Sequence, residues 1–183
     1  MKKLILIIGL IIGITFSSCN NEKINKIDMG MYTIEVPHNW KKINIKGIDS
    51  YIAVILTPSG DTIISDYGKY SEKFDETNKV FSKEQILKYK TLGMDTENLF
   101  VSNYPEIDQA QGTFLNEYYM YEVIDKYNVK FRIPKKDNKG IIGISIDSLF
   151  KSNNRLTIYS KNLNKKEKDL FLNSLYTIKF EKK

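Results

Sequence analysis

Cysteine and histidine are almost absent from this chain, which has one of each, Cys19 and His38, in 183 residues. A single cysteine forms no disulfide within the chain, so stability must come from the packed core. One cysteine and one histidine are also too few for the usual zinc sites. His38 stands in a Pro-x-x-Trp turn with no obvious nucleophile beside it, so we interpret it as a surface residue rather than a catalytic base. We predict no metal and no cofactor.

Arginine is nearly as scarce, because Arg132 and Arg155 are the only arginines among 28 basic residues. The formal net charge of +6 is therefore carried by lysine. Recognition of nucleic acid favours arginine, whose guanidinium makes bidentate contacts. We therefore predict no nucleic-acid partner and interpret most lysines as solvated surface, with a weak attraction to anionic headgroups or acidic glycans left open.

No apolar run is long enough to span a membrane. The longest run, Leu4–Phe16, has 13 residues, whereas a membrane-spanning helix needs about 20. It follows a basic start, Met1-Lys2-Lys3, and precedes two small residues, Ser17 and Ser18. A basic start, a short apolar stretch and small residues are typical of a secretory signal.

The end of this segment, Phe16-Ser17-Ser18-Cys19, resembles the end of bacterial lipoprotein signals, although those more often have Leu in place of Phe16 and Gly or Ala in place of Ser18. The resemblance implies that the Cys19 thiol takes a diacylglycerol and that the signal, 1–18, is cut away. It predicts a protein of the cell envelope, held by its lipid on a membrane outside the cytoplasm. The alternative is an ordinary cleaved signal with a spare thiol.

The remaining chain has the length of one domain. Residues 19–29 are short of large apolar side chains, which predicts a flexible tether after Cys19 and a single domain over 30–183. Met31–Val36 is a predicted strand. Tyr51–Thr57 is almost continuously apolar, as is typical of a strand covered on both faces, and Thr62–Tyr67 is its expected hairpin partner.

The second half of the chain predicts a helix, a meander and another helix. Ser82 and Gln85 form a capping box for a helix that ends at Gly93. A helix from Asn164 carries apolar residues at helical spacing. The predicted strands are 118–124, 129–133, 141–147, 155–160 and 176–180. We therefore predict an α+β fold, an antiparallel sheet with helices packed on it.

Two short stretches, Pro37-x-x-Trp40 and Thr177-Ile178-Lys179-Phe180, resemble the opening and the close of Mog1/PsbP-like domains. The resemblance covers most of 30–183 in outline and implies a sheet between helices and a role in binding other proteins. Residues 47–51 and 66–71 also resemble small, functionally unassigned lipoproteins of Bacteroidota-type bacteria.

Acidic residues flank the two strands of the predicted hairpin. Asp49 precedes the first strand, Asp61 lies in the turn and Asp66 ends the second, so pairing brings Asp49 and Asp66 to the same edge. A carboxylate pair there suits calcium or acid–base chemistry. Capping and turn formation account for the same residues equally simply, and no calcium-loop spacing is present.

Tyrosines are the other candidates for binding. Tyr67 and Tyr70 lie beside Asp66, and Tyr118, Tyr119 and Tyr121 follow one another along a strand whose faces alternate. Exposed tyrosines suit protein or glycan contacts, and core packing is the alternative. The basic turn that contains Lys135, Lys136 and Lys139 suits either solvent or an acidic partner.

From these features we expect a membrane-anchored, non-catalytic module that binds a protein or an envelope component, with Asp49, Asp66, Tyr67 and Tyr70 as its site. Two alternatives remain open. One is a hydrolase of glycan or peptide that works through carboxylates, and the other is a periplasmic immunity protein. The sequence leaves the oligomeric state undetermined.

Overall fold

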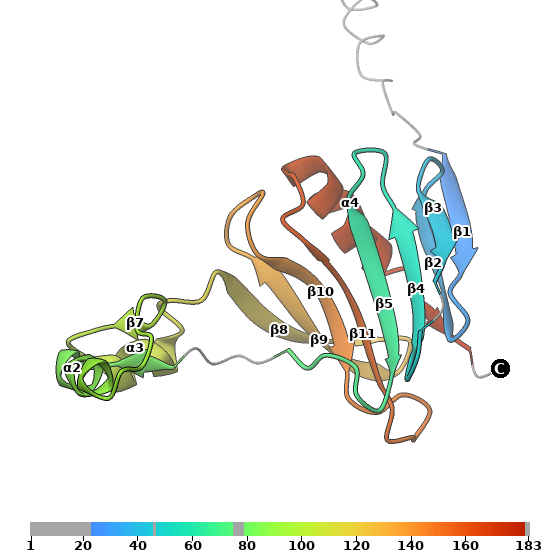
Figure 1. Cartoon of the computed structure of the whole chain (residues 1–183). Helices are drawn as coiled ribbons and strands as arrows, with labels where there is room; N and C mark the ends of the chain where they lie inside the picture. The colour runs from blue at the N-terminus through green and yellow to red at the C-terminus, as the bar shows by residue number, and fades with distance from the viewer. Residues whose placement is uncertain (1–22, 46, 75–78, 182–183) are drawn as a thin grey trace, which may run out of the picture.

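The structure is a computed structural model that describes residues 23–45, 47–74 and 79–181. The predicted signal, 1–18, and the predicted lipidation residue, Cys19, therefore lie outside the described residues. The described residues form two parts of unequal size, a body built on a large sheet and a small satellite, which we define as residues 79–116 (Figure 1).

Two antiparallel sheets form the body. The larger has seven strands in the order β3-β4-β5-β11-β10-β9-β8, and the smaller has three in the order β1-β2-β12. Helix α4 (Lys165–Leu175) packs against β2 and β10, which confirms the predicted α+β fold. The strands of the body are β1 (Ile24–Asp28), β2 (Tyr32–Pro37), β3 (Lys41–Asn44), β4 (Tyr51–Leu56), β5 (Thr62–Gly68), β8 (Glu117–Ile124), β9 (Tyr127–Pro134), β10 (Ile141–Ile146), β11 (Arg155–Lys161) and β12 (Lys179–Phe180).

The core lies between the seven-stranded sheet, α4 and the three-stranded sheet. Because side chains alternate along a strand, directly paired residues of neighbouring strands share one face of the sheet. One such row across the sheet is Ala53, Ser65, Ile158, Ile144 and Phe131. All five are buried, together with Phe171 and Leu175 of α4. We call this covered face the inner face and the opposite one the outer face.

Both ends of α4 follow from the sequence. At its start, the Asn164 side chain accepts a hydrogen bond of 3.0 Å from the Glu167 N–H, as an N-cap does. At its end, the Thr177 and Ile178 N–H groups still bond to helix carbonyls, so the chain becomes extended only at Lys179. The predicted strand 176–180 is therefore shorter than expected.

The predicted tether is also shorter than expected, because β1 occupies most of residues 23–29. β1 pairs with β2 along its whole length, from Ile24 opposite Pro37 to Asp28 opposite Thr33. Ile27 and Met29 are buried, and their burial holds this otherwise polar segment on the body. The segment lacks the alternation of a typical strand, and pairing across a turn decides its structure instead.

Trp40 is buried, as the Pro-x-x-Trp turn predicts, because the chain reverses after β2 and the Trp40 N–H donates to the Pro37 carbonyl.

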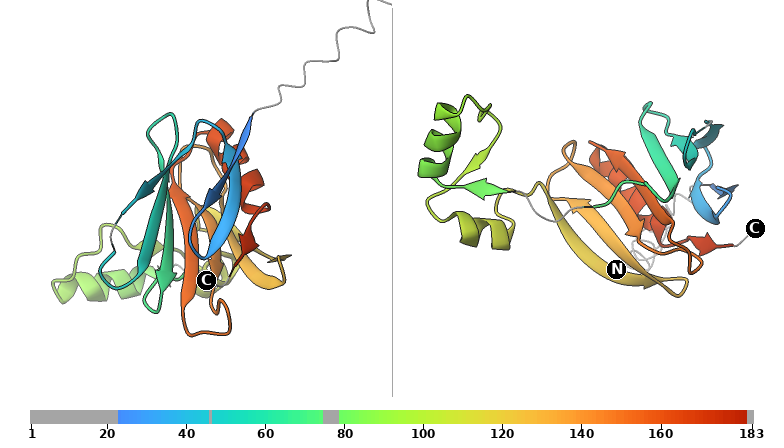
Figure 2. Two further views of the ribbon diagram at one scale, coloured as in Figure 1. Left: turned by 90° about the vertical axis from the view of Figure 1, so that its right-hand side faces the viewer. Right: turned by 60° about the horizontal axis from the view of Figure 1, so that its bottom comes forward.

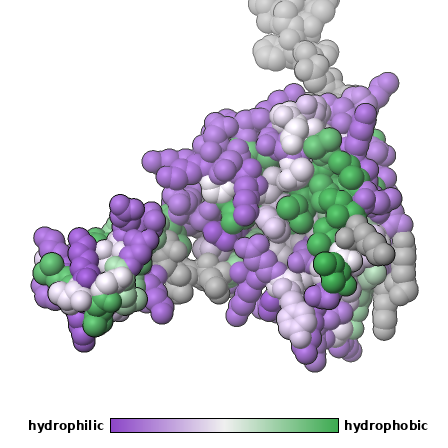
Figure 3. Space-filling view, viewed as in Figure 1, coloured by the Kyte–Doolittle hydropathy of each residue, from purple (hydrophilic) through white to green (hydrophobic). Residues whose placement is uncertain are grey.

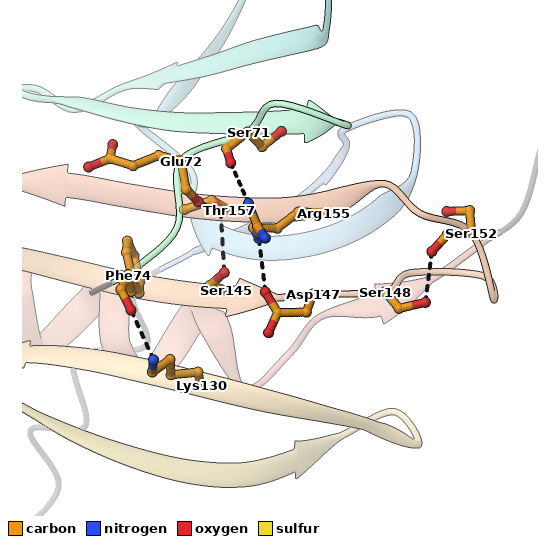
Figure 4. A network of polar contacts seen from close by, with 10 residues as sticks. All are labelled: Ser71, Glu72, Phe74, Lys130, Ser145, Asp147, Ser148, Ser152, Arg155 and Thr157. Atoms are coloured by element: carbon orange, nitrogen blue, oxygen red, sulfur yellow. Dashed lines mark hydrogen bonds and ion pairs between the residues drawn. The ribbon is translucent and has the colours of Figure 1, made fainter. Parts of the chain in front are cut away.

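A long connection runs from β5 to β8, which is the edge strand of the large sheet on the side opposite β3. To reach β8 the chain crosses the outer face as a short segment, Ser71–Phe74, which we call the strap (Figure 4).

The sheet holds the strap by its backbone. Arg155 Nη1 donates to the Ser71 carbonyl at 2.8 Å, Thr157 Oγ1 to the Glu72 carbonyl at 2.6 Å and Lys130 Nζ to the Phe74 carbonyl at 2.9 Å. The Phe74 ring is buried and lies 5.5 Å from the Arg132 guanidinium, a cation–π distance. The strap is therefore fixed across β11, β10 and β9 before the chain enters the satellite.

The satellite stands off the β8 edge of the body (Figure 2). Its two short strands, β6 (Val80–Phe81) and β7 (Phe100–Val101), pair in parallel, and it has two helices, α2 (Lys83–Thr91) and α3 (Pro105–Gln111). The predicted capping box at Ser82 and Gln85 is present. The sequence did not predict α3, which has no side-chain cap, begins with a proline and ends at Gly112 in the left-handed region.

Candidate functional site

The hairpin β4–β5 separates the four residues expected to form a site. Asp49 and Asp66 do share one end of the hairpin, and Tyr70, beyond it, is 78% exposed. Asp66 lies on the outer face, paired with Ile52 and Thr157, whereas Tyr67 lies on the inner side, with its hydroxyl 3.5 Å from Ser152 Oγ. Asp49, Asp66 and Tyr70 therefore remain candidates for one surface, and Tyr67 belongs to the other face.

Beside this end of the hairpin, the outer face presents an aliphatic surface across three strands, which we call the β3–β5 face. Ile43, Val54 and Ile64 pair directly across β3, β4 and β5. Ile45, Ile52 and Leu56 extend this row along the strands. Ile43 and Ile45 are 40% and 49% exposed, and the area is continuous and hydrophobic in Figure 3.

The prediction that β4 is covered on both faces holds only in part, because on the outer face Val54 is buried whereas Ile52 and Leu56 beside it are half-buried. Ala53 and Ile55 are buried on the inner face, as expected. On the outer face, α4 is absent because it packs on the other side, and the satellite helices lie beyond the far edge of the sheet (Figure 1). Within the described part of the chain, no helix covers the outer side of β4.

A polar border separates the β3–β5 face from the strap. Tyr159 of β11 pairs with Ile64 of β5, and Asp66 lies two residues after Ile64 on the same face of β5. Burial raises the pKa of Tyr159, and the carboxylates of Glu72 and Asp66 raise it further. Asp66 Oδ1 is buried and has no hydrogen-bond partner among the described residues. The border therefore combines one phenol with two carboxylates, and one of these carboxylates has a buried oxygen without a hydrogen-bond partner among the described residues.

The carboxylate pair of this protein is at the opposite end of the hairpin. Asp61 does not meet Asp49 or Asp66, because it lies in the β4–β5 turn and hydrogen-bonds with Glu167 of α4. Ser59 Oγ lies 3.1 Å from Asp61 Oδ2 and 2.5 Å from Glu167 Oε1. Asn164 Nδ2 donates to the other Glu167 oxygen at 3.1 Å. We call Ser59, Asp61 and Glu167 the clasp.

The two carboxyl groups of the clasp titrate in opposite directions. The hydrogen bond with Glu167, followed by burial, raises the pKa of Asp61. Burial alone works to raise the pKa of Glu167, but hydrogen bonds from Ser59, Thr57 and Asp61 outweigh it and lower that pKa. Asp61 is therefore the group that holds a shared proton, because like charges in contact disfavour double ionisation.

Ser59 and Glu167 of the clasp line a cavity of about 390 Å³ that His38 also lines. Acid–base hydrolysis of a glycoside needs two carboxyl groups roughly 5–10 Å apart, with substrate or water between them. Asp61 and Glu167 instead share one hydroxyl, Ser59 Oγ, which ties the β4–β5 turn to the start of α4. This geometry joins two elements of the body and leaves no such gap.

The remaining candidates from the sequence, three tyrosines of β8 and the basic turn, lie away from the β3–β5 face. Tyr118 and Tyr121 on β8 are 47% and 66% exposed, and Tyr119 lies under the cations of Lys130 and Arg132. The basic turn with Lys135, Lys136 and Lys139 joins β9 to β10. Within the described ranges, no group of three or more His, Cys, Asp or Glu is placed to hold a metal ion. No helix there is long and apolar enough to cross a membrane.

Comparison with known proteins adds one structural neighbour. No protein-family model matches the chain, and no curated relative does. Among solved structures, the chain is similar to the solution structure of PsbP (CyanoP) from the cyanobacterium Synechocystis sp. PCC 6803, with 8% sequence identity and a TM-score of 0.44 over 90% of this chain and 96% of that one. The neighbour is a PsbP protein, the kind that the opening and closing motifs resemble. At this score we draw neither a shared function nor shared residues from it.

Proposed function

We propose that this protein is a lipid-anchored, non-catalytic module of the cell envelope that binds a partner protein through the β3–β5 face. The observation that carries the proposal is the outer side of β4. Its sequence is that of a strand covered on both faces, and yet in the described structure only Val54 is buried on the outer side, Ile52 and Leu56 stay half-buried, and no helix packs there. A partner protein supplies the missing cover.

The chemistry of the surface favours a protein over a glycan. Its centre consists of branched aliphatic side chains, which offer a sugar hydroxyl no hydrogen bond. Burying the exposed parts of Ile43 and Ile45 stabilises a complex by about 1 kcal/mol each. Asp66, Glu72 and Tyr159 then form a polar rim beside an apolar centre, the usual anatomy of a protein interface.

Anchoring rests on Cys19, which the sequence offers as a lipidation site. Because β1 begins at Ile24, five residues later, an extended chain spans only about 17 Å between them. A diacylglycerol on Cys19 then holds the body close to the bilayer, and the partner belongs to the same region. The full-length protein should incorporate radioactive fatty acid and its Cys19→Ala variant should not. An unlabelled wild type would refute the anchor.

Photo-cross-linking in native membranes tests the binding surface. A photoreactive amino acid replaces Ile43 in one variant and Leu87 of the satellite, 63% exposed, in the control. We expect a discrete heavier adduct from position 43 and none from position 87. Adding Ile45→Asp should abolish the adduct, because a carboxylate then enters the apolar interface.

Two variants examine the rim of the same surface. Asp66→Ala should reduce the yield of the adduct, whereas Asp61→Ala, at the other end of the hairpin, should not. Tyr70→Phe removes one exposed hydroxyl and tests whether Tyr70 belongs to the rim. Identical adduct patterns from positions 43 and 87 would refute the β3–β5 face as the binding site.

A further inference from the structure

Two adjoining cavities lie between the satellite and the body, at the β8 edge of the sheet, opposite the edge that carries the β3–β5 face. The larger, about 600 Å³, lies between the satellite and the start of β8. The smaller, about 250 Å³, lies beside the β9–β10 turn. Both are lined by Leu115 and Lys135, so they are immediate neighbours, and we call the two together the cleft.

The larger part of the cleft is lined by amides, carboxylates and tyrosine rings. Gln85, Gln109 and Gln111 come from the satellite, and Glu117 and Tyr118 come from β8. A primary amide both donates and accepts hydrogen bonds, so three of them suit a ligand that does the same at many positions. Hydroxyl groups on adjacent carbons of a sugar have that property, and the apolar face of a pyranose ring suits a tyrosine ring.

Three of these side chains are held in place by the backbone, the first being Gln85, whose Oε1 accepts from the Ser82 N–H at 2.8 Å in the capping box. Gln109 Oε1 accepts a hydrogen bond of 3.2 Å from the Val80 N–H, which directs its amide nitrogen. Glu117 is buried and accepts from the Ile141 N–H at 2.8 Å and from Arg132 Nη2 at 3.2 Å. Gly140 makes room for this carboxylate, because a Cβ there would lie 2.6 Å from Glu117 Oε1. The wall of the cleft is therefore preorganised at these three points.

The smaller part of the cleft is basic. Lys135, Lys136 and Lys139 line it, and all three are exposed. The one carboxylate of the same turn, Asp137, forms an ion pair with Lys168 of α4, which offsets its charge. Among the described residues, Lys135 Nζ makes a long bond of 3.4 Å to the Gly112 carbonyl. Three ammonium groups therefore adjoin the polar cleft, which favours an anionic group at this end of a ligand.

We propose that the cleft binds an acidic oligosaccharide. Its hydroxyl groups bond to the amides of Gln85, Gln109 and Gln111, one ring packs on Tyr118, and its acidic group lies at Lys135, Lys136 and Lys139. Glu106 also lines the cleft and opposes the negative charge, so the acidic group belongs at the lysine end only. This site is separate from the β3–β5 face and does not depend on the protein partner proposed there.

Equilibrium dialysis of the full-length protein in detergent tests the proposal with two matched probes. Trigalacturonate supplies hydroxyls and carboxylates, and galactotriose supplies the same rings without the charge. We expect trigalacturonate to bind about tenfold more tightly than galactotriose, with an affinity that falls as salt is added. Failure of trigalacturonate to bind, or equal binding of the two sugars, would overturn the proposal.

Two triple variants locate the acidic group. Lys135→Gln, Lys136→Gln and Lys139→Gln together should weaken trigalacturonate binding about tenfold. The matched control neutralises Lys83, Lys88 and Lys90 on α2, which are also exposed, and should change binding less than about twofold. Equal weakening by both triple variants would mean unspecific attraction and would overturn the site. Tyr118→Ala should weaken both sugars, whereas Ile43→Asp, on the β3–β5 face, should weaken neither.

Discussion

The body and the satellite differ in how much of their apolar surface they bury. The body encloses a core in which Phe131, Phe171 and Leu175 have no measurable exposure. In the satellite, Val80 and Ile86 are the buried hydrophobic residues among those described. Its large exposed hydrophobics are Leu87, Leu92, Met94, Phe100, Val101, Tyr104 and Ile107. The body therefore carries its own stability, and the satellite does not.

Size explains the difference. The satellite has two strands of two residues each and helices of nine and seven residues. Isolated helices shorter than about 12 residues are marginal in water, and isolated two-stranded units are little better. The satellite should therefore open locally at a lower free energy than the body. Such a part suits a wall of a ligand cleft, because a bound ligand stabilises the closed state.

The largest expected effect comes from one matched pair of substitutions. Phe171→Ala should lower the free energy of unfolding by about 3–5 kcal/mol, because it empties a fully buried site in the core of the body. Ile86→Ala removes a buried side chain from the satellite and should speed hydrogen exchange there, with little change in global unfolding. Denaturant titration and native-state hydrogen exchange measure the two quantities.

A substitution at an exposed residue of the satellite is the control for Ile86→Ala and Phe171→Ala. Ile107 is 55% exposed, so Ile107→Ala should leave both measurements nearly unchanged. If Ile86→Ala instead shifts global unfolding as much as Phe171→Ala, then satellite and body unfold as one cooperative unit and the satellite has no lower stability of its own.

The strap offers an intermediate effect, because it joins the two parts. Phe74→Ala should lower the free energy of unfolding by about 3 kcal/mol and also loosen the satellite, since it removes the buried ring beside Arg132. Hydrogen exchange should then rise in residues 79–116. Lys73→Ala is the control, since Lys73 is an exposed strap residue. Unchanged exchange in the satellite after Phe74→Ala would show that the strap does not position it.

Local signals predicted the fold well, and the residues show why. Ser82 with Gln85, Asn164 with Glu167, and Pro37 with Trp40 each act within a few residues, and each lies where the sequence placed it. The meander β8-β9-β10-β11 also follows from alternation and short turns. Neither β1 nor α3 could be predicted this way, because β1 is formed by its pairing with β2 rather than by alternation and α3 has no side-chain cap.

The candidate sites were harder to predict for the same reason. The acidic residues of the hairpin suggested a pair at Asp49 and Asp66, whereas Asp61 pairs with Glu167 from the far end of the chain. Ser59 and Glu167 of the same clasp are 108 residues apart. The incomplete cover on the outer side of β4 could not be predicted either, because an apolar run has the same sequence pattern whether another element of the chain or a partner covers it.

The smallest expected effect belongs to the clasp, which lies in the body alone. The pKa of Asp61 is raised above its ordinary value of 3.8, so the folded protein holds this proton more tightly than the unfolded chain. The stability that the proton contributes is present at low pH and is lost as pH rises through the raised pKa. The lowered pKa of Glu167 acts oppositely and contributes stability that is lost as pH falls.

Asp61→Asn separates these two contributions. An asparagine amide donates to Glu167 as a protonated Asp61 does, but it never acquires the opposing charge. At pH 7 the variant should therefore be more stable than wild type by about 0.5 kcal/mol, and the difference should shrink as pH falls through the raised pKa of Asp61. Asp49→Asn, at an exposed site, should show no such difference. Because the clasp lies in the body alone, hydrogen exchange in the satellite should not follow this pH dependence. An Asp61→Asn effect that is constant from pH 4 to 8, or that appears equally in the satellite, would contradict the proton shared between Asp61 and Glu167.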